Sequence, residues 1–383
     1  MDRPDAPGPL SRRGPRPLLL HLTLATLKSS GLADGWPSWN GGLPSWNPAA
    51  ADFPPSDPEL LAGIAAYRRH PWRREVVDPP VLWEEGGSRL LDFGPPDAPP
   101  ALFVPSLINR AYVFDLAPGH SMLRFLAANG VRPLLLDWGW PGPVERQFTL
   151  TDYVAGRLER ALIACGRATL VGYCMGGLLA IALAQRRPDL VSALGLLATP
   201  WDFQAADPEG ASRLGSMVPF LEPVLAFSDT LSVDVLQMLF ALLDPGSVAD
   251  KYRHFGGLDQ ESERARHFVA IEDWLNDGVP LAAPVARECL AGWYGANTPT
   301  RGAWRVAGEV IDPRRLRLPA FVAVPGRDRI VPRQSAAPLV GLIDGSRLHE
   351  PHAGHVGMVA GARAEWLLWQ PLLAWLHEVA GAG

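Results

Sequence analysis

Short apolar runs alternate with amphipathic stretches from about residue 80 of the 383-residue chain onward. The runs 101–104, 168–171 and 194–198 are mostly apolar, and each ends close to a glycine or proline, which is typical of buried strands. Apolar residues within 154–165 recur at helical spacing and predict an amphipathic helix. This alternation predicts an α/β fold, a mostly parallel sheet with helices on both faces.

The strand and helix pattern is interrupted once. Residues 201–313 are irregular, helix-leaning and rich in aromatic side chains, and the apolar run 320–324 then resumes the sheet pattern. We therefore expect a core formed by 79–200 and 314–383, with 201–313 inserted as a lid subdomain over the site. Residues 1–78 precede the core as a proline-rich N-terminal arm, since 11 of the 39 prolines lie in the first 60 residues.

An apolar run at 18–27 follows three arginines within this arm. The run is too short to span a bilayer, and no A-x-A cleavage site follows it. We expect a short helix packed on the body of the protein, or a surface-seeking segment, rather than a signal peptide.

Charge and cysteine content narrow the function classes. The formal net charge of −5 provides no basic field to attract nucleic acid, so we expect no nucleic-acid partner. The three cysteines are widely separated, without a CxxC pair for zinc or a disulfide framework. A reducing cytoplasm fits this content best and allows one reactive thiol.

The pentapeptide Gly172-Tyr173-Cys174-Met175-Gly176 lies where a predicted buried strand meets a predicted helix. It has the form of the G-x-nucleophile-x-G elbow with cysteine in place of serine. Its glycines would let strand and helix approach closely, and the helix N-terminus would favour a thiolate at Cys174. The alternative is a buried, inert cysteine in a glycine-rich turn.

Candidate acid and base residues follow in the order nucleophile, acid, histidine that the α/β-hydrolase fold requires. Asp328 lies in a loop after the strand 320–324, and His349, His352 and His355 follow the next predicted strand. We expect His355 to be the base, with His352 as the competitor, and Asp328 to orient it; a solvated turn aspartate is the alternative. No acidic or cysteine partner lies at helical spacing from the histidines, so no metal site is expected.

These residues predict a division of roles. His355 would take the proton of Cys174, and Asp328 would stabilise the imidazolium that forms. Two backbone N–H groups are needed to bind an oxyanion. We expect one from Met175, directly after the nucleophile, and the other from the loop 106–108.

Beyond the elbow, four segments resemble the poly(3-hydroxyalkanoate) synthase family. These are a Pro-Ser-Leu-Ile-Asn-Arg stretch continuing to Asp115-Leu116, the segments 121–126 and 136–138, and the tryptophan-centred segment 273–278. The resemblance covers roughly residues 80–375. The chain departs from the family pattern directly after Asp328, where Arg329 replaces the usual histidine.

The resemblance implies an α/β-hydrolase fold with a Cys-His-Asp triad at Cys174, His355 and Asp328, and Ile108 as the second oxyanion amide. It implies 3-hydroxyacyl-CoA and the growing polyester chain as substrates, and no cofactor besides the CoA thioester. It also implies a cytoplasmic protein that can associate with polyester granules and that acts as a homodimer or with a partner subunit.

Three functions remain open at this point. The resemblance favours an acyltransferase that polymerises 3-hydroxyacyl-CoA into polyhydroxyalkanoate and releases CoA. A cysteine-dependent hydrolase on the same fold is the alternative, either a thioesterase, an intracellular polyester depolymerase or an esterase similar to dienelactone hydrolases. A catalytically inactive granule-coating scaffold is the third, and the ordered triad argues against it.

Overall fold

The computed structural model describes residues 12, 14–29, 57–241, 243 and 247–381, and these divide into two compact units. Residues 74–233 and 277–383 form the first, here called the sheet unit. Residues 1–73 and 234–276 form the second, called the helical unit. Each unit is described by itself.

The sheet unit contains an eight-stranded sheet in the order β1-β2-β6-β3-β7-β8-β13-β14. The strands β1 and β2 are antiparallel, β2 pairs antiparallel with β6, and the remaining neighbours are all parallel. This confirms the predicted mostly parallel sheet. The strand bounds are β1 Val81–Glu85, β2 Ser88–Asp92, β3 Pro100–Val104, β6 Arg132–Asp137, β7 Ala168–Tyr173, β8 Val191–Leu197, β13 Ala320–Ala323 and β14 Arg347–His349.

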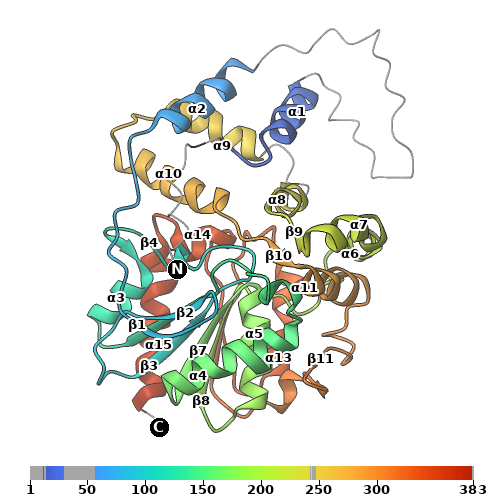
Figure 1. Ribbon diagram of the computed structural model, residues 1–383. Coiled ribbons are helices and arrows are strands. Elements are labelled where there is room, and N and C mark those ends of the chain that lie inside the picture. The colour runs from blue at the N-terminus through green and yellow to red at the C-terminus, as the bar shows by residue number, and fades with distance from the viewer. Residues whose placement is uncertain (1–11, 13, 30–56, 242, 244–246, 382–383) are drawn as a thin grey trace. The chain divides into compact units, whose positions relative to one another are not determined.

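Helices lie on both sides of the sheet, with α4 (Glu159–Cys165) and α5 (Met175–Arg186) toward the viewer in Figure 1. The central strand β7 is buried along its whole length, which explains its mostly apolar sequence. The predicted helix within 154–165 is observed as a π-helix, Asp152–Leu158, continuing into α4. The sheet unit also contains the helices α3 Met122–Ala128, α12 Arg333–Ala336, α13 Pro338–Leu342, α14 His355–Ala360 and α15 Gln370–Gly381.

The predicted lid segment is helical, but its parts belong to different units. Helices α6 (Pro208–Ser216) and α7 (Val218–Ser228) and the π-helix η5 (Glu288–Gly295) lie in the sheet unit. A Cβ added at Gly215 of α6 would lie 2.4 Å from the Cα of Gly295, so these helices approach as closely as backbone allows. The strands β9 (Thr230–Leu231) and β10 (Leu281–Ala282), which pair, and α11 (Ala283–Arg287) complete this part.

Residues 234–276 instead cluster with N-terminal helices in the helical unit. Its helices are α1 Leu18–Ser29, α2 Pro58–Arg69, α8 Val233–Ala241, which starts one residue before the unit, α9 Ser247–Gly256 and α10 Glu263–Asn276. Buried residues of α2 and α9 share one core, and a Cβ at Gly63 would lie 1.9 Å from the carbonyl oxygen of Tyr252. The boundaries of the compact units therefore differ from those of the predicted arm 1–78 and the predicted insertion 201–313. The difference arises because α2, from the arm, packs on α9, from within the insertion.

The N-terminal arm contains more regular structure than its proline content indicates. The run 18–27 forms most of α1, as predicted, whereas α2 was not predicted. The guanidinium of Arg12 donates to Asp273 and to the carbonyls of His70 and Trp72, which ties the start of the described chain to α10. Residues 1–11, 13 and 30–56 of the arm lie outside the described residues.

Candidate active site

Cys174 occupies the sharp turn between β7 and α5. Its backbone has φ 54° and ψ −127°, a left-handed conformation that is strained for any residue with a side chain. The N–H of Cys174 donates to the carbonyl of Leu197 at the end of β8, and its own carbonyl accepts from Gly177. The predicted strand–turn–helix elbow is therefore present, with the thiol at the carboxyl edge of the sheet.

The elbow glycines are required by close backbone approach. A Cβ at Gly172 would lie 2.4 Å from the Cα of Gly177, and a Cβ at Gly176 would lie 2.0 Å from the carbonyl oxygen of Val104. In both cases the neighbouring atom is backbone, which cannot rotate away as a side chain can. The first turn of α5 thus packs directly on the ends of β7 and β3.

Gly176→Ala is expected to destabilise the protein by about 1–3 kcal/mol, because the added methyl group forces the backbone at Val104 to move. Urea unfolding measures the change. Gly341→Ala in α13 is the matched control, since a Cβ there meets nothing within 4 Å and alanine favours helix. Equal stability of the two variants would contradict the packing argument.

Asp328 and His355 lie in contact, each on the segment that follows the carboxyl end of a strand, β13 for Asp328 and β14 for His355. His355, the first residue of α14, donates from Nδ1 to Oδ2 of Asp328 over 2.6 Å, and both side chains are buried. The other carboxylate oxygen of Asp328 accepts from the N–H groups of Ile330 and Val331 at 2.8 and 2.9 Å. The loop therefore holds a buried carboxylate in a fixed orientation, unlike a solvated turn aspartate.

His355 also interacts with Cys174. Burial by itself disfavours the imidazolium, but the charges of Cys174 and Asp328, together with hydrogen bonds to both, raise the pKa of His355 to about 10. Because Nδ1 is bonded to Asp328, Nε2 is the ring nitrogen left for the thiol. The structure thus brings together Cys174, His355 and Asp328, the three residues that the sequence places in a triad.

The other two histidines of the segment are placed differently. His352 is exposed. His349 forms a hydrogen bond from Nε2 to the carbonyl of Leu367 and stacks on Phe321 with ring centroids 5.4 Å apart. The contact with the buried carboxylate of Asp328 is made by His355, which favours it over His352 as the base.

Tyr173 supports the histidine ring, a contact that the sequence did not indicate. Its ring stacks on His355 with centroids 4.9 Å apart, and its hydroxyl donates to the carbonyl of His355 over 3.3 Å. Phe114 packs edge-on against the Tyr173 ring, with ring centroids 5.7 Å apart. The sequence shows that an aromatic residue, Tyr173, directly precedes Cys174. It does not show that this ring contacts His355, because the two residues are 182 positions apart.

The two predicted oxyanion donors differ in their surroundings. Met175 is the first residue of α5, and N–H groups in the first turn of a helix have no acceptor within it. The N–H of Ile108 donates to the hydroxyl of Ser106 over 3.1 Å, and the Ile108 carbonyl accepts from Val279. Ile108 would therefore have to release Ser106 before its N–H could bind a substrate oxygen.

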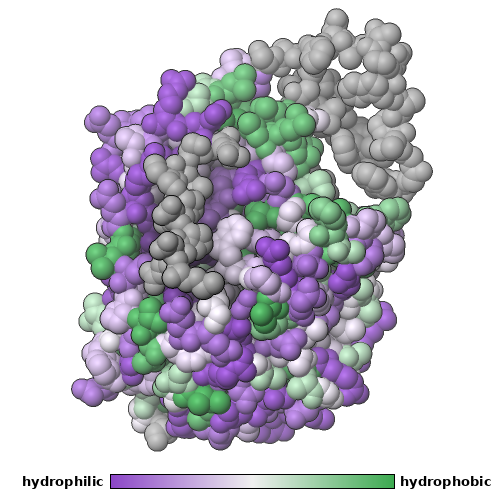
Figure 2. Space-filling view, viewed as in Figure 1, coloured by the Kyte–Doolittle hydropathy of each residue, from purple (hydrophilic) through white to green (hydrophobic). Residues whose placement is uncertain are grey.

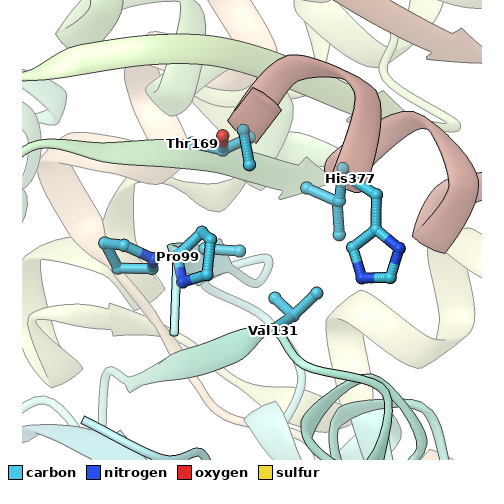
Figure 3. A pocket seen from close by; sticks show the side chains of 8 residues that line it. Pro99, Val131, Thr169 and His377 are labelled. Carbon is cyan, nitrogen blue, oxygen red and sulfur yellow. The ribbon is translucent and has the colours of Figure 1, made fainter. Parts of the chain in front are cut away.

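Among the described residues no group of three or more His, Cys, Asp or Glu could hold a metal ion, and no helix is long and apolar enough to cross a membrane. On the face seen in Figure 2, hydrophilic and hydrophobic side chains are interspersed. A small hollow lined by Pro99, Val131, Thr169 and His377 lies at the amino ends of the strands, away from the triad (Figure 3).

The sequence matches a family model described as "Alpha/beta hydrolase family" over residues 101–367. The chain belongs to the alpha/beta hydrolase family. The matched range begins in β3 and ends near α15, so it includes the elbow, the Asp328 loop and His355.

Within this family the chain is similar to poly(3-hydroxyalkanoate) polymerase subunits, which confirms the resemblance seen in the sequence. It is 29% identical to the subunit PhaC of Haloferax mediterranei over 79% of this chain and 64% of that protein. It is 27% identical to the subunit PhaC of Allochromatium vinosum over 74% of this chain and 83% of that protein. The chain thus spans less than two thirds of the Haloferax protein and most of the Allochromatium one.

A solved structure shares the fold of this alpha/beta hydrolase. A carboxylesterase of Nitrososphaera gargenis is 15% identical, with a TM-score of 0.50, and the match covers 78% of this chain and 99% of the esterase. At this identity the likeness concerns the fold alone.

Proposed function

We propose that this protein is an acyltransferase that polymerises 3-hydroxyacyl-CoA into polyhydroxyalkanoate through an acyl thioester on Cys174. The observation that carries the proposal is a cysteine, rather than a serine, at the elbow and in contact with the buried His355–Asp328 pair. The similarity to proteins named poly(3-hydroxyalkanoate) polymerase subunits supports the choice of substrate.

In the acylation step, the proton of Cys174 passes to His355, whose raised pKa favours the imidazolium, and the thiolate attacks the thioester carbonyl of 3-hydroxyacyl-CoA. The carbonyl oxygen gains negative charge and binds the N–H of Met175, with the N–H of Ile108 as the second donor once it leaves Ser106. The intermediate then expels CoA, whose thiolate takes the proton from His355. One thioester replaces another, so the step is nearly balanced in free energy.

In the transfer step, His355 removes the proton from the hydroxyl of a second 3-hydroxyacyl group, and the oxygen attacks the Cys174 thioester. An oxygen ester forms, the Cys174–acyl bond breaks, and the proton on His355 returns to the thiol. Water competes with this hydroxyl as acceptor. A bound and aligned hydroxyl can gain several kcal/mol over free water, which is the advantage that polymerisation requires.

The proposal extends to location and partners. The cysteines Cys165, Cys174 and Cys289 are free, which supports a reducing cytoplasm. Association with the polyester granule surface, and action as a homodimer or with a partner subunit, follow from the resemblance, and the relatives are themselves named as subunits.

Product analysis with 3-hydroxybutyryl-CoA tests the proposed function. We expect the protein, alone or with a partner subunit of a related system, to release CoA and to form ester-linked oligomers. Thiol release is followed with a disulfide dye, and acyl products are separated by chromatography after the protein is removed. Stoichiometric free 3-hydroxybutyrate without oligomer, even with the partner present, would replace the proposal by a cysteine-dependent hydrolase.

A further inference from the structure

The side chain of Tyr173 contacts the proposed base but has no part in the steps above. Tyr173 is the last residue of β7, where it pairs with Leu197 of β8, and the next residue in the chain is Cys174. The backbone of Tyr173 is therefore held within the sheet, and the backbone of the nucleophile follows directly from it. A contact from this side chain to His355 fixes the base relative to the thiol.

Two contacts hold the imidazole of His355 in one orientation. Asp328 accepts a hydrogen bond from Nδ1 over 2.6 Å, which fixes one edge of the ring. Tyr173 covers a face of the same ring, with centroids 4.9 Å apart and an angle of 30° between the planes. An edge contact and a face contact together restrict rotation of the imidazole, so Nε2 stays available to the Cys174 thiol, to which the histidine is hydrogen-bonded.

The Tyr173 ring is itself held by its surroundings. Its hydroxyl donates to the carbonyl of His355 over 3.3 Å, and both residues are buried. Phe114 contacts the ring edge-on, and Phe114 packs in the same way against Phe103 of β3, with centroids 5.5 Å apart. The phenol therefore belongs to a packed aromatic group and cannot turn away from the imidazole without disrupting it.

The phenol presents a neutral, electron-rich face to the imidazole. Burial raises the pKa of Tyr173 well above its ordinary value, and the charges of Cys174 and Asp328 raise it further, so the hydroxyl stays protonated. An aromatic face attracts a cation placed over it within about 6 Å, and more strongly where water is excluded. The buried ring of Tyr173 therefore favours the imidazolium form of His355 over the neutral form.

The groups that face the His355 ring differ in charge. The thiol of Cys174 faces it from the elbow, the carboxylate of Asp328 from the loop after β13, and the phenol of Tyr173 from the end of β7. The first two raise the pKa of His355 through their charges. Tyr173 acts without a charge of its own, so replacing its ring leaves both ionic contacts in place.

We propose that Tyr173 is a positioning residue of the active site, whose ring holds His355 against Cys174 and stabilises the imidazolium that protonates the departing CoA thiolate. The inference deepens the proposed function and rests on it for the identity of the leaving group. Because Tyr173 is buried, it acts through His355 rather than on the substrate. A change in its ring is therefore expected to alter the titration of His355 and to leave KM nearly unchanged.

Replacing the ring tests this assignment through the titration of His355. Isotope-labelled histidine gives one NMR signal per imidazole, and the signal of His355 is identified as the one absent from His355→Ala. We expect its midpoint near pH 10 in the wild type. In Tyr173→Leu the midpoint is expected to fall by about one pH unit, the size of a buried cation–π contact. Tyr173→Phe keeps the ring and should retain the wild-type midpoint.

Acylation by 3-hydroxybutyryl-CoA provides a second readout. His355 must be protonated when CoA leaves, so the acylation rate falls at alkaline pH as the imidazolium is lost. In Tyr173→Leu this alkaline limb is expected to move by the same amount as the NMR midpoint, while KM stays within about twofold of the wild type.

A second substitution separates the charge of the ring face from its shape. Pentafluorophenylalanine incorporated at position 173 keeps the shape of the ring but withdraws electrons from its face. It is expected to lower the midpoint as Tyr173→Leu does, and it gives the answer where the leucine variant does not fold.

Tyr153→Leu is the matched control. Tyr153 is a buried tyrosine of the same unit that packs on Trp138 and Phe148, so its loss should leave the His355 midpoint unchanged. Thermal unfolding of each variant measures the loss of stability that a purely structural role would cause.

Each other outcome overturns the assignment in a recognisable way. An unchanged midpoint in the folded variants that lack the electron-rich ring shows that the ring does not stabilise the imidazolium. An equal fall in Tyr173→Phe assigns the effect to the hydroxyl, and an equal fall in Tyr153→Leu shows a general loss of packing. A raised KM with an unmoved alkaline limb shows that Tyr173 contacts the substrate. The titration uses no substrate, so absence of CoA release, which refutes the proposed function, is recognised separately.

Discussion

Cys174→Ala is expected to reduce CoA release from 3-hydroxybutyryl-CoA by a factor on the order of a thousand or more. The variant lacks the sulfur that would carry the acyl group, so neither acylation nor transfer can proceed through the proposed intermediate. Alanine and cysteine share the strained backbone at φ 54°, and the elbow is expected to fold as before. CoA release and intact-protein mass after incubation with substrate measure the loss of turnover and of the acyl adduct.

Cys165→Ala provides the control for this experiment. Cys165 ends α4 in the same unit, and burial raises the pKa of its thiol to about 12, so it is not expected to act as a nucleophile. Its variant should keep both the activity and the acyl adduct. Substantial activity in Cys174→Ala, or an adduct that persists there and vanishes in Cys165→Ala, would refute the assignment of the nucleophile.

Asp328→Asn is expected to slow acylation by a factor on the order of a thousand or more, since the carboxylate orients His355 and stabilises its imidazolium. The amide would also lower the pKa of His355, because one of the two negative charges that raise it is removed. The rate of Cys174 acylation as a function of pH measures both effects.

The pH dependence of stability has a definite sign. The pKa of His355 is raised to about 10 in the folded protein, above its ordinary value, so the folded state binds this proton more tightly than the unfolded state. The resulting stabilisation is complete below about pH 6.5 and is lost as the pH rises through about 10. Urea unfolding between these values should show a smaller loss of stability with rising pH in Asp328→Asn than in the wild type.

His352→Ala separates the two candidate bases. The exposed His352 is expected to be replaceable with little change in rate, whereas His355→Ala should resemble Cys174→Ala. A severe loss in His352→Ala together with a mild one in His355→Ala would reverse the assignment.

Local sequence signals were sufficient for the sheet and for the elbow. The central strands β3, β7 and β8 are almost entirely buried, so most of their positions are apolar and their runs stand out in the sequence. The signal for the elbow is likewise local, because the turn at Cys174 needs glycine at positions 172 and 176, which lie within one pentapeptide. The order of Cys174, Asp328 and His355 follows from the order of the strands.

The helix α2 shows a local signal that proline content concealed. Asp57 caps the helix by accepting from the N–H of Leu60, and Pro58 occupies its first turn, where proline is favoured. Leu60, Ile64 and Tyr67 then recur at helical spacing and are buried. The sequence therefore contained the helix start and its apolar face, within a segment otherwise typical of irregular chain.

The sequence by itself determined the fold class and a short list of candidate catalytic residues, because each depends on neighbours within a few positions. Only the tertiary structure distinguished His355 from His352 and placed Tyr173 on the imidazole ring. It also assigned the helices of the insertion to different compact units. The first two of these outcomes depend on contacts between residues 27 to 182 positions apart, and the periodicity of a single chain contains no record of such pairings.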